Sequence, residues 1–354
     1  MKEESDHDYL KGRGAQLNTH NPFQKHEYVQ EHWEGLDEAY QRPPKREVFL
    51  EHPKKIVNKV ESPDLPMPYS INPYQGCEHG CIYCYARNSH QYWGYSAGLD
   101  FESKLIAKPN APQLLEKKLL SKTWQPQPIS LSGNTDCYQP LEKELKITRQ
   151  LLAVFLKYGH PVSIITKNQL VLRDLDILRP LAEQNLVHVY LSVTTLDESL
   201  RRKLEPRTAT GANRLKVVET LTKNGIPTGV MAAPIIPGIN NQEIPSLIKA
   251  ASEAGALTVG YTMVRLNGNV GALFEDWLRK NFPDRAEKVW HQIQGLHGGK
   301  VNSSEFGARM RGQGQIAESI HQLFALNKRK YFAHQQMPAY NLKAFRRGGM
   351  EPLF

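Results

Sequence analysis

Three of the four cysteines lie within eight residues and have the spacing C-x3-C-x2-C: Cys77, Cys81 and Cys84. Thiolates are soft ligands that suit zinc or an iron–sulfur cluster. A structural zinc site needs a fourth ligand, which His79, His90 or Cys137 could supply, whereas an iron–sulfur cluster can leave one iron open to another molecule. Four cysteines in 354 residues argue against a disulfide framework. The spacing therefore predicts a metal centre.

Short β-branched apolar runs alternate with segments of helical period downstream of the cysteines. The runs are 129–132, 162–166, 188–194, 227–233 and 257–264, and the helical segments between them are 141–158, 173–184, 212–223 and 242–253. The runs start 26 to 39 residues apart, which is the spacing of repeated βα units. This pattern predicts an α/β fold with a parallel sheet, either open or curled into a barrel. Functional residues should gather at the carboxyl ends of its strands.

The chain divides into three parts. Residues 1–62 are polar, with prolines that interrupt any long helix, and we expect an irregular arm there. Residues 63–268 hold the cysteines and the βα series and form the expected core domain. Residues 269–354 form an expected helical, basic extension, with helical segments at 273–281, 284–294 and 314–326. No apolar run is long enough to span a membrane and the start lacks a secretory signal, so we expect a soluble, cytoplasmic protein.

The cysteine motif, with Tyr83 just before the last cysteine and a βα series behind it, resembles the radical S-adenosylmethionine (SAM) superfamily over about residues 65–267. The resemblance implies a [4Fe-4S] cluster on Cys77, Cys81 and Cys84, whose fourth iron binds the amino and carboxylate groups of SAM. One-electron reduction then cleaves SAM to methionine and a 5′-deoxyadenosyl radical, which abstracts hydrogen from a substrate. The implied fold is a partial (β/α)6 barrel of the TIM type, and the implied partner is a flavodoxin- or ferredoxin-like electron donor.

Within the superfamily, the residues around Cys84 resemble the spore photoproduct lyase branch and a related group of uncharacterised bacterial radical SAM proteins. In that branch the equivalents of Thr135, Lys167 and Ser192 contact SAM. An ammonium at a strand end can pair with the methionine carboxylate, and hydroxyls can bind its other polar groups. The apolar turn at 234–238 could form a wall for the adenine or be a plain turn. The expected cofactor-binding residues are therefore Tyr83, Thr135, Lys167, Ser192 and Pro234.

The chain departs from the lyase at a cysteine that returns hydrogen to the substrate in that enzyme. The position that aligns with it is Gly133, and Cys137 lies four residues further on. Cys137 could serve as a hydrogen donor or radical relay, or it could be a buried core thiol. Tyr85 matches a tyrosine implicated in the lyase's radical transfer, and it could instead be a packing residue. Cys137 and Tyr85 are the candidate catalytic residues.

Other polar residues are expected at the carboxyl ends of the strands. Asp136 and Gln139 are suited to hydrogen-bond a substrate, and Arg265, at the end of the presumed sixth strand, is suited to bind an anionic group. We expect Glu205 and Arg207 to form an ion pair that closes the rim of the barrel.

The chain has 45 basic and 36 acidic residues, a net charge of +9, and most of the excess follows Lys300. There the C-terminal segment interleaves cations with aromatic residues, as a surface that tracks phosphates and stacks bases would. This favours nucleic acid as a substrate or partner, although charged segments are more often solvated surface. Two alternatives stand beside it: a nucleic-acid-binding module whose metal is only structural, and a small-molecule radical SAM enzyme with incidental basicity.

Overall fold

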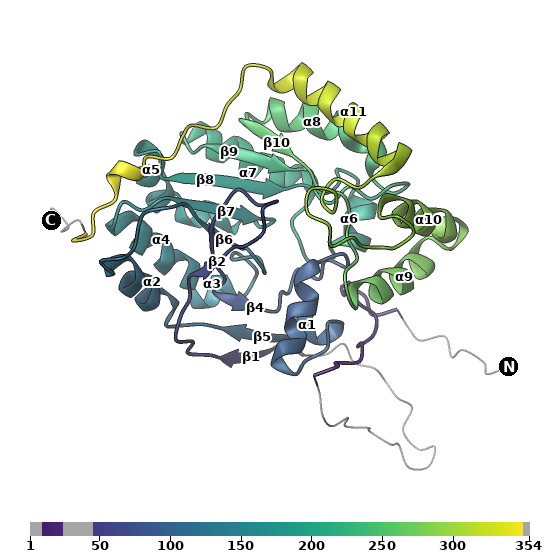
Figure 1. Ribbon diagram of the computed structural model, residues 1–354, viewed down its shortest axis with the longest axis horizontal. Helices are drawn as coiled ribbons and strands as arrows, with labels where there is room; N and C mark the ends of the chain where they lie inside the picture. Colours follow the sequence, from purple (N-terminus) through teal and green to yellow (C-terminus); the bar gives the residue numbers. More distant parts are fainter. Residues whose placement is uncertain (1–8, 24–44, 350–354) are drawn as a thin grey trace, which may run out of the picture.

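The computed structural model describes residues 9–23 and 45–349. In this part of the chain, a seven-stranded sheet contains six parallel strands that lie side by side in their order along the sequence (Figure 1). These strands are β3 (Tyr69–Ile71), β6 (Ile129–Leu131), β7 (Val162–Thr166), β8 (Val187–Ser192), β9 (Thr228–Met231) and β10 (Thr258–Gly260). The short strand β2 (Asn58–Lys59) pairs antiparallel with β3. This α/β architecture confirms the expected partial (β/α)6 barrel.

Helices connect the parallel strands and supply one side of the hydrophobic core. In chain order they are α2 (Ala111–Leu120), α3 (Glu142–Leu145), α4 (Ile147–Lys157), η2 (Gln169–Asp174), α5 (Leu175–Glu183), α6 (Glu198–Leu204), α7 (Gly211–Lys223), η3 (Asn241–Glu243) and α8 (Ile244–Glu253). Leu131, Ile164 and Val189 stand in register on three neighbouring strands and are fully buried with helix residues such as Leu151 and Val218. Alternate strand positions therefore pack against the helices, as the pleat requires.

A second, three-stranded sheet leads into the cysteines. Its order is β1 (Glu47–Leu50), β5 (Lys104–Ala107) and β4 (Tyr74–Gln75), and η1 (Tyr85–Trp93) and α1 (Leu99–Ser103) lie between β4 and β5 in the chain. Strands β1 and β2 both come from the part of the sequence that we expected to be irregular. The last part of the N-terminal arm, from residue 45 to residue 62, thus contributes a strand to each of the two sheets. Residues 1–8 and 24–44 of the arm lie outside the described residues.

The expected helix over 141–158 is divided in two by Lys146, which has a left-handed backbone (φ 53°). The cause is the buried carboxylate of Glu142, which accepts hydrogen bonds from the backbone N–H groups of Thr148 (2.9 Å) and Arg149 (3.3 Å). The first N–H groups of a helix have no hydrogen-bond partner within the helix. The carboxylate of Glu142 accepts from these groups and therefore favours the start of a new helix, α4, at this position.

The C-terminal extension is helical, as expected, through α9 (Val270–Asn281), η4 (Pro283–Arg285), α10 (Ala286–Leu296) and α11 (Gly314–Phe332), and η5 (Leu342–Ala344) follows near its end. Helix α11 packs on α8 and β10. Within the described residues, no helix combines the length and apolar character that a membrane crossing requires.

After α11 the chain crosses the end of the sheet at which the strands begin (Figure 1, left). The ring of Tyr340 stacks on His188, with centroids 3.9 Å apart, and Phe345 meets His160 edge-on at 5.6 Å. Arg347 Nη2 donates to the Trp124 carbonyl at 2.9 Å. Phe345, one of the aromatic residues of the basic segment that we expected to stack bases, thus packs against the rest of the chain, at the opposite end of the strands from the expected site.

Candidate functional site

The three expected metal ligands lie on one loop that begins where β4 ends. Gly76 (φ +76°) and Gly80 (φ +68°) allow its turns, because both have left-handed backbones that favour glycine. Cys77 and Cys81 are each 6% exposed, Cys84 is half-buried, and all three are free thiols. The sequence thus places the three sulfurs on a short, buried loop.

The electrostatics of the three thiols fit a cationic metal cluster. Burial raises the pKa of Cys77 well above its usual range, and Asp136, Cys81 and Cys84 raise it further. Burial also raises the pKa of Cys84, whereas the positive charge of Arg87 lowers it in part. The thiols therefore lie close enough to disfavour one another's anionic forms, which iron would stabilise. Among the described residues, no group of three or more His, Cys, Asp or Glu side chains is arranged to hold a single metal ion.

Gln139 and Asp136 support this loop and its neighbouring strand. The fully buried amide of Gln139 donates to the Gly76 carbonyl (3.0 Å) and accepts from the Glu78 N–H (3.1 Å). Asp136 accepts from Thr166 Oγ1 and from the Lys167 N–H, both at 2.8 Å. In the structure these two side chains hold the cysteine loop and the end of β7, and the expected role of both in binding a substrate stays a prediction.

Glu205 is the centre of a buried polar network at the rim of the barrel. Its carboxylate accepts from the Tyr83 hydroxyl and from Thr194 Oγ1 (2.7 Å), and it pairs with Arg214 and with Lys167 Nζ (3.4 Å). Burial acts to raise its pKa, but Arg214 and Lys167 lower it below its usual range. One carboxylate thus joins the cysteine loop to the ends of β7 and β8 and to α7.

The expected pair between Glu205 and Arg207 does not form. Arg207 Nε instead donates to the Gly12 carbonyl at 3.0 Å, and the partner of Glu205 is Arg214, nine residues further along the chain. Arg214 also donates to the Ser192 carbonyl at 2.8 Å. The role of Arg214 could not be predicted from the sequence, because α7 brings it to the rim from within a helix.

The other expected cofactor-binding residues follow neighbouring strands at the same end of the sheet. Thr135 comes after β6, and its Oγ1 donates to the Tyr74 carbonyl at 2.7 Å. Ser192 ends β8 and is buried. Pro234 follows β9, and its carbonyl accepts from Asn240 Nδ2 at 3.0 Å. The structure brings Lys167 and Tyr83 together, since the Lys167 ammonium lies 5.9 Å from the centroid of the Tyr83 ring.

Tyr85 is exposed and donates from its hydroxyl to the Gly133 carbonyl at 2.7 Å. Arg265 lies close enough to Tyr85 to influence its ionisation, and burial lowers the pKa of Arg265 itself. Among the described residues, the guanidinium of Arg265 has hydrogen bonds to Asn302 Oδ1 (3.4 Å) and Met310 Sδ (3.2 Å) and no ion pair. A phenol and a partly buried cation thus lie near each other at the rim.

Gly133 has no room for a side chain. A Cβ built there would lie 2.8 Å from Cβ of Ser70, closer than side chains approach in folded proteins. We expect Gly133→Ala to lower the free energy of unfolding by about 1–3 kcal/mol, measured by urea denaturation. Gly295→Ala is the matched control, because no atom lies within 4 Å of its Cβ and α10 gains an alanine. An unchanged stability for Gly133→Ala would contradict this account of position 133.

Cys137 is fully buried within the main hydrophobic core, apart from the loop of the other cysteines. Its N–H donates to Ser132 Oγ (2.7 Å) and its carbonyl accepts from Thr148 Oγ1 (2.6 Å). Burial raises the pKa of the thiol well above its usual range. This environment is that of a packing residue, and a catalytic role for Cys137 stays a prediction.

A segment that sequence reasoning missed covers the cysteine loop: residues 9–23, which we call the N-terminal strap. The buried carboxylate of Glu102 accepts from the N–H groups of Gly14 (3.2 Å) and Ala15 (2.8 Å) and from Arg87 Nη2 (2.6 Å). Arg87 Nε in turn donates to the Cys81 carbonyl at 2.9 Å. A Cβ at Gly14 would lie 1.7 Å from the Gly80 oxygen, so only glycine permits this approach. The strap therefore packs directly on the loop.

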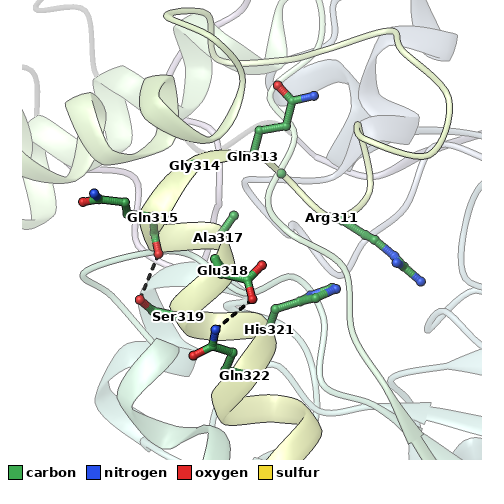
Figure 2. A pocket seen from close by; sticks show the side chains of 10 residues that line it. Arg311, Gln313, Gly314, Gln315, Ala317, Glu318, Ser319, His321 and Gln322 are labelled. Atoms are coloured by element: carbon green, nitrogen blue, oxygen red, sulfur yellow. Dashed lines mark hydrogen bonds between the residues drawn. The ribbon is translucent and has the colours of Figure 1, made fainter.

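A separate hollow of about 680 Å³ lies at the start of α11 (Figure 2). Arg311, Gln313, Glu318 and His321 are among its lining residues. Gln322 Nε2 donates to Glu318 Oε1 at 2.9 Å across its wall. None of the expected metal or cofactor residues lines this hollow.

Comparisons with known proteins identify the family of the chain. A family model described as the radical SAM superfamily matches residues 71–251. An uncharacterised protein of Mycobacterium tuberculosis is 32% identical over 234 residues, which cover 65% of this chain and 69% of that protein. An uncharacterised protein of Methanocaldococcus jannaschii is 30% identical over 245 residues, which cover 69% of this chain and 87% of that protein.

Among solved structures, spore photoproduct lyase complexed with a dinucleoside spore photoproduct has a similar fold. Its TM-score is 0.60 at 14% sequence identity, and the match covers 80% of this chain and 79% of that one. At this identity the likeness concerns the fold.

Proposed function

Because the chain belongs to the radical SAM superfamily, whose cofactors are a [4Fe-4S] cluster and SAM, we propose that Cys77, Cys81 and Cys84 hold the cluster in this enzyme. When both cofactors are bound, reductive cleavage of SAM supplies a deoxyadenosyl radical that abstracts hydrogen from the substrate. The observation that carries the assignment is the buried loop with three free thiols at the carboxyl end of the parallel sheet. The protein must orient these groups and exclude water and oxygen.

The residues of the rim suit the polar groups of SAM. The Lys167 ammonium is held by Glu205 and can pair with a carboxylate. Thr135 donates its hydroxyl proton to Tyr74, so its oxygen remains an acceptor for an amino group. Ser192 and Pro234 follow neighbouring strands and complete the proposed SAM site, with Tyr83 fixed beside the cysteine loop by Glu205. We place the enzyme in the cytoplasm, where thiols stay reduced.

Anaerobic reconstitution tests this function. The protein is loaded with iron and sulfide, reduced with dithionite in the presence of SAM, and analysed for 5′-deoxyadenosine. We expect the visible absorbance of a [4Fe-4S] cluster and SAM-dependent formation of 5′-deoxyadenosine. A protein that retains zinc without assembling a cluster, or a cluster that does not cleave SAM, would contradict the proposal.

For the substrate, a nucleic-acid component is the class to test first, because the lyase that shares this fold was solved with a dinucleoside. Photoproduct repair is not proposed, since position 133 carries no thiol and Cys137 lies in the core. The last part of the C-terminal segment, around Tyr340 and Phe345, lies at the far end of the strands and is not proposed as a path for the substrate. Arg265 at the rim is the better placed cation. Binding of short single-stranded DNA that weakens as salt rises would support this class, and no binding at low salt would remove it.

A further inference from the structure

An exposed apolar strand lies close to the cysteine loop. Strand β1 is the edge of the three-stranded sheet, and Val48, Phe49 and Leu50 are 39%, 38% and 63% exposed. We call these three residues the apolar edge. An unpaired strand edge presents free backbone groups, and contiguous exposed apolar side chains mark interaction sites. Among the described residues no strand pairs with the outer side of β1, so the apolar edge is a candidate interaction surface.

The strand register places the apolar edge next to the proposed cluster. Phe49 of β1 and Gln75 of β4 both pair with Ile106, from opposite sides of β5. Neighbouring strands lie about 4.8 Å apart, so β1 is roughly 10 Å from β4. Gln75 is two residues before Cys77. Electron transfer through protein slows steeply with distance, so a donor that docks here would be well placed.

A series of ring contacts connects the same two places. The Phe49 ring lies 5.7 Å from Tyr95, Tyr95 lies 5.3 Å from His90, and His90 lies 5.6 Å from Phe101, measured between ring centroids. Phe101 is buried in a small cluster with Cys77. A continuous series of ring contacts thus connects the apolar edge with the cluster of buried residues around Cys77.

The charge around the apolar edge favours an acidic partner. Residues 45–59 contain five basic and two acidic side chains. Lys104 pairs with Asp100 (3.1 Å) and Lys108 with Glu51 (3.9 Å), whereas Lys54 and Lys55 are exposed and form no ion pair among the described residues. Complementary charge steers a partner and raises the rate of association.

We propose that the apolar edge, with Lys54 and Lys55 beside it, is the docking surface for the protein that supplies the electron. The partner is a small acidic one-electron carrier, such as a reduced flavodoxin or ferredoxin. One electron leaves the carrier's cofactor, which is oxidised by one electron, and the cluster is reduced by one electron; no group is transferred. This inference rests on the proposed function, because it requires the cluster.

The test compares two reductants on the reconstituted protein. The double variant Phe49→Asp, Leu50→Asp is reduced either with a flavodoxin hydroquinone or with dithionite, and loss of cluster absorbance is followed. We expect flavodoxin to bind more weakly, measured by calorimetry, and to reduce the variant about tenfold more slowly, while the dithionite rate is unchanged. Leu326→Asp on α11, where the wild-type leucine is 56% exposed, is the matched control and should behave as wild type.

A second variant separates charge from apolar contact. Lys54→Glu, Lys55→Glu should slow reduction by flavodoxin and weaken the dependence of its rate on salt. Wild-type rates with flavodoxin in both variants, or equal slowing with both reductants, would overturn the proposal. If the wild-type protein forms a dimer and the first variant abolishes it, the apolar edge binds a second copy of the chain. That result would also overturn the proposal. A wild-type protein that assembles no cluster would instead contradict the proposed function.

Discussion

Cys84→Ala is expected to abolish both cluster assembly and SAM cleavage. The three cysteines are the only thiols on the loop. When one of them is removed from a [4Fe-4S] cluster held by three thiolates, one iron atom loses its protein ligand. The iron content after reconstitution should fall from about four atoms per chain to a small remaining amount. The amount of 5′-deoxyadenosine formed should fall below the limit of detection. Iron analysis, visible absorbance and chromatography of the nucleoside measure these changes.

Cys137→Ala is the matched control, because it removes the remaining thiol from a core position apart from the loop. The variant should keep full iron content, while its stability falls, as expected when a buried side chain is truncated. Turnover of the substrate should also fall if Cys137 has the catalytic role predicted from the sequence. Loss of the cluster in Cys137→Ala, or its retention in Cys84→Ala, would show that the proposed ligands are wrong.

Arg214→Met is expected to have the largest effect on stability. It leaves the fully buried carboxylate of Glu205 without its closest cation and the Ser192 carbonyl without a donor. Removing one partner of a buried ion pair costs about 3–5 kcal/mol. The free energy of unfolding, measured in urea at pH 7, should fall by this amount. Arg202→Met is the control, since Arg202 is exposed on α6 and its pair with Glu198 is worth at most about 1 kcal/mol.

The pH dependence of this variant gives a second measurement. In the wild type the pKa of Glu205 is lowered, despite burial, by Arg214 and Lys167. Its contribution to stability is therefore present above the pKa of an unfolded glutamate and is lost only as the pH falls through the lower folded value. Without Arg214, one of the charges that oppose burial is lost, and we expect the pKa of Glu205 to rise. The stability difference between variant and wild type should then shrink as the pH falls from 7 towards about 5. A constant difference would contradict this account.

Much of the fold could be predicted because each parallel strand is a short apolar run bounded by turns. The run 162–166 is β7 with the same bounds. Strand β3 was missed because its three residues lie between prolines at 68 and 73 and have no distinct period. The break at Lys146 was also missed, because the buried carboxylate that starts α4 belongs to the preceding turn and the periodicity continues across it.

The site was predictable where its residues are close in sequence or follow strands. The cysteine loop and Lys167 are such cases. The Glu205 network was not, because Thr194 and Arg214 reach the carboxylate from a strand end and a helix that only the closed rim brings together. We expected an ion pair between Glu205 and Arg207 because the two residues are close in the sequence. In the structure, Arg207 instead donates to the N-terminal strap.

The N-terminal strap has a consequence for the order of events during synthesis. It is synthesised before the residues that anchor it: Glu102, which accepts from Gly14 88 residues away, and Asn269, whose amide donates to Thr19 from 250 residues away. At typical bacterial elongation rates the second interval lasts roughly 10 to 50 s. A nascent chain therefore exposes its cysteine loop for a limited time before the last anchor emerges. If iron and sulfide reach the cysteine loop within that time, the N-terminal strap does not have to detach from the folded protein later.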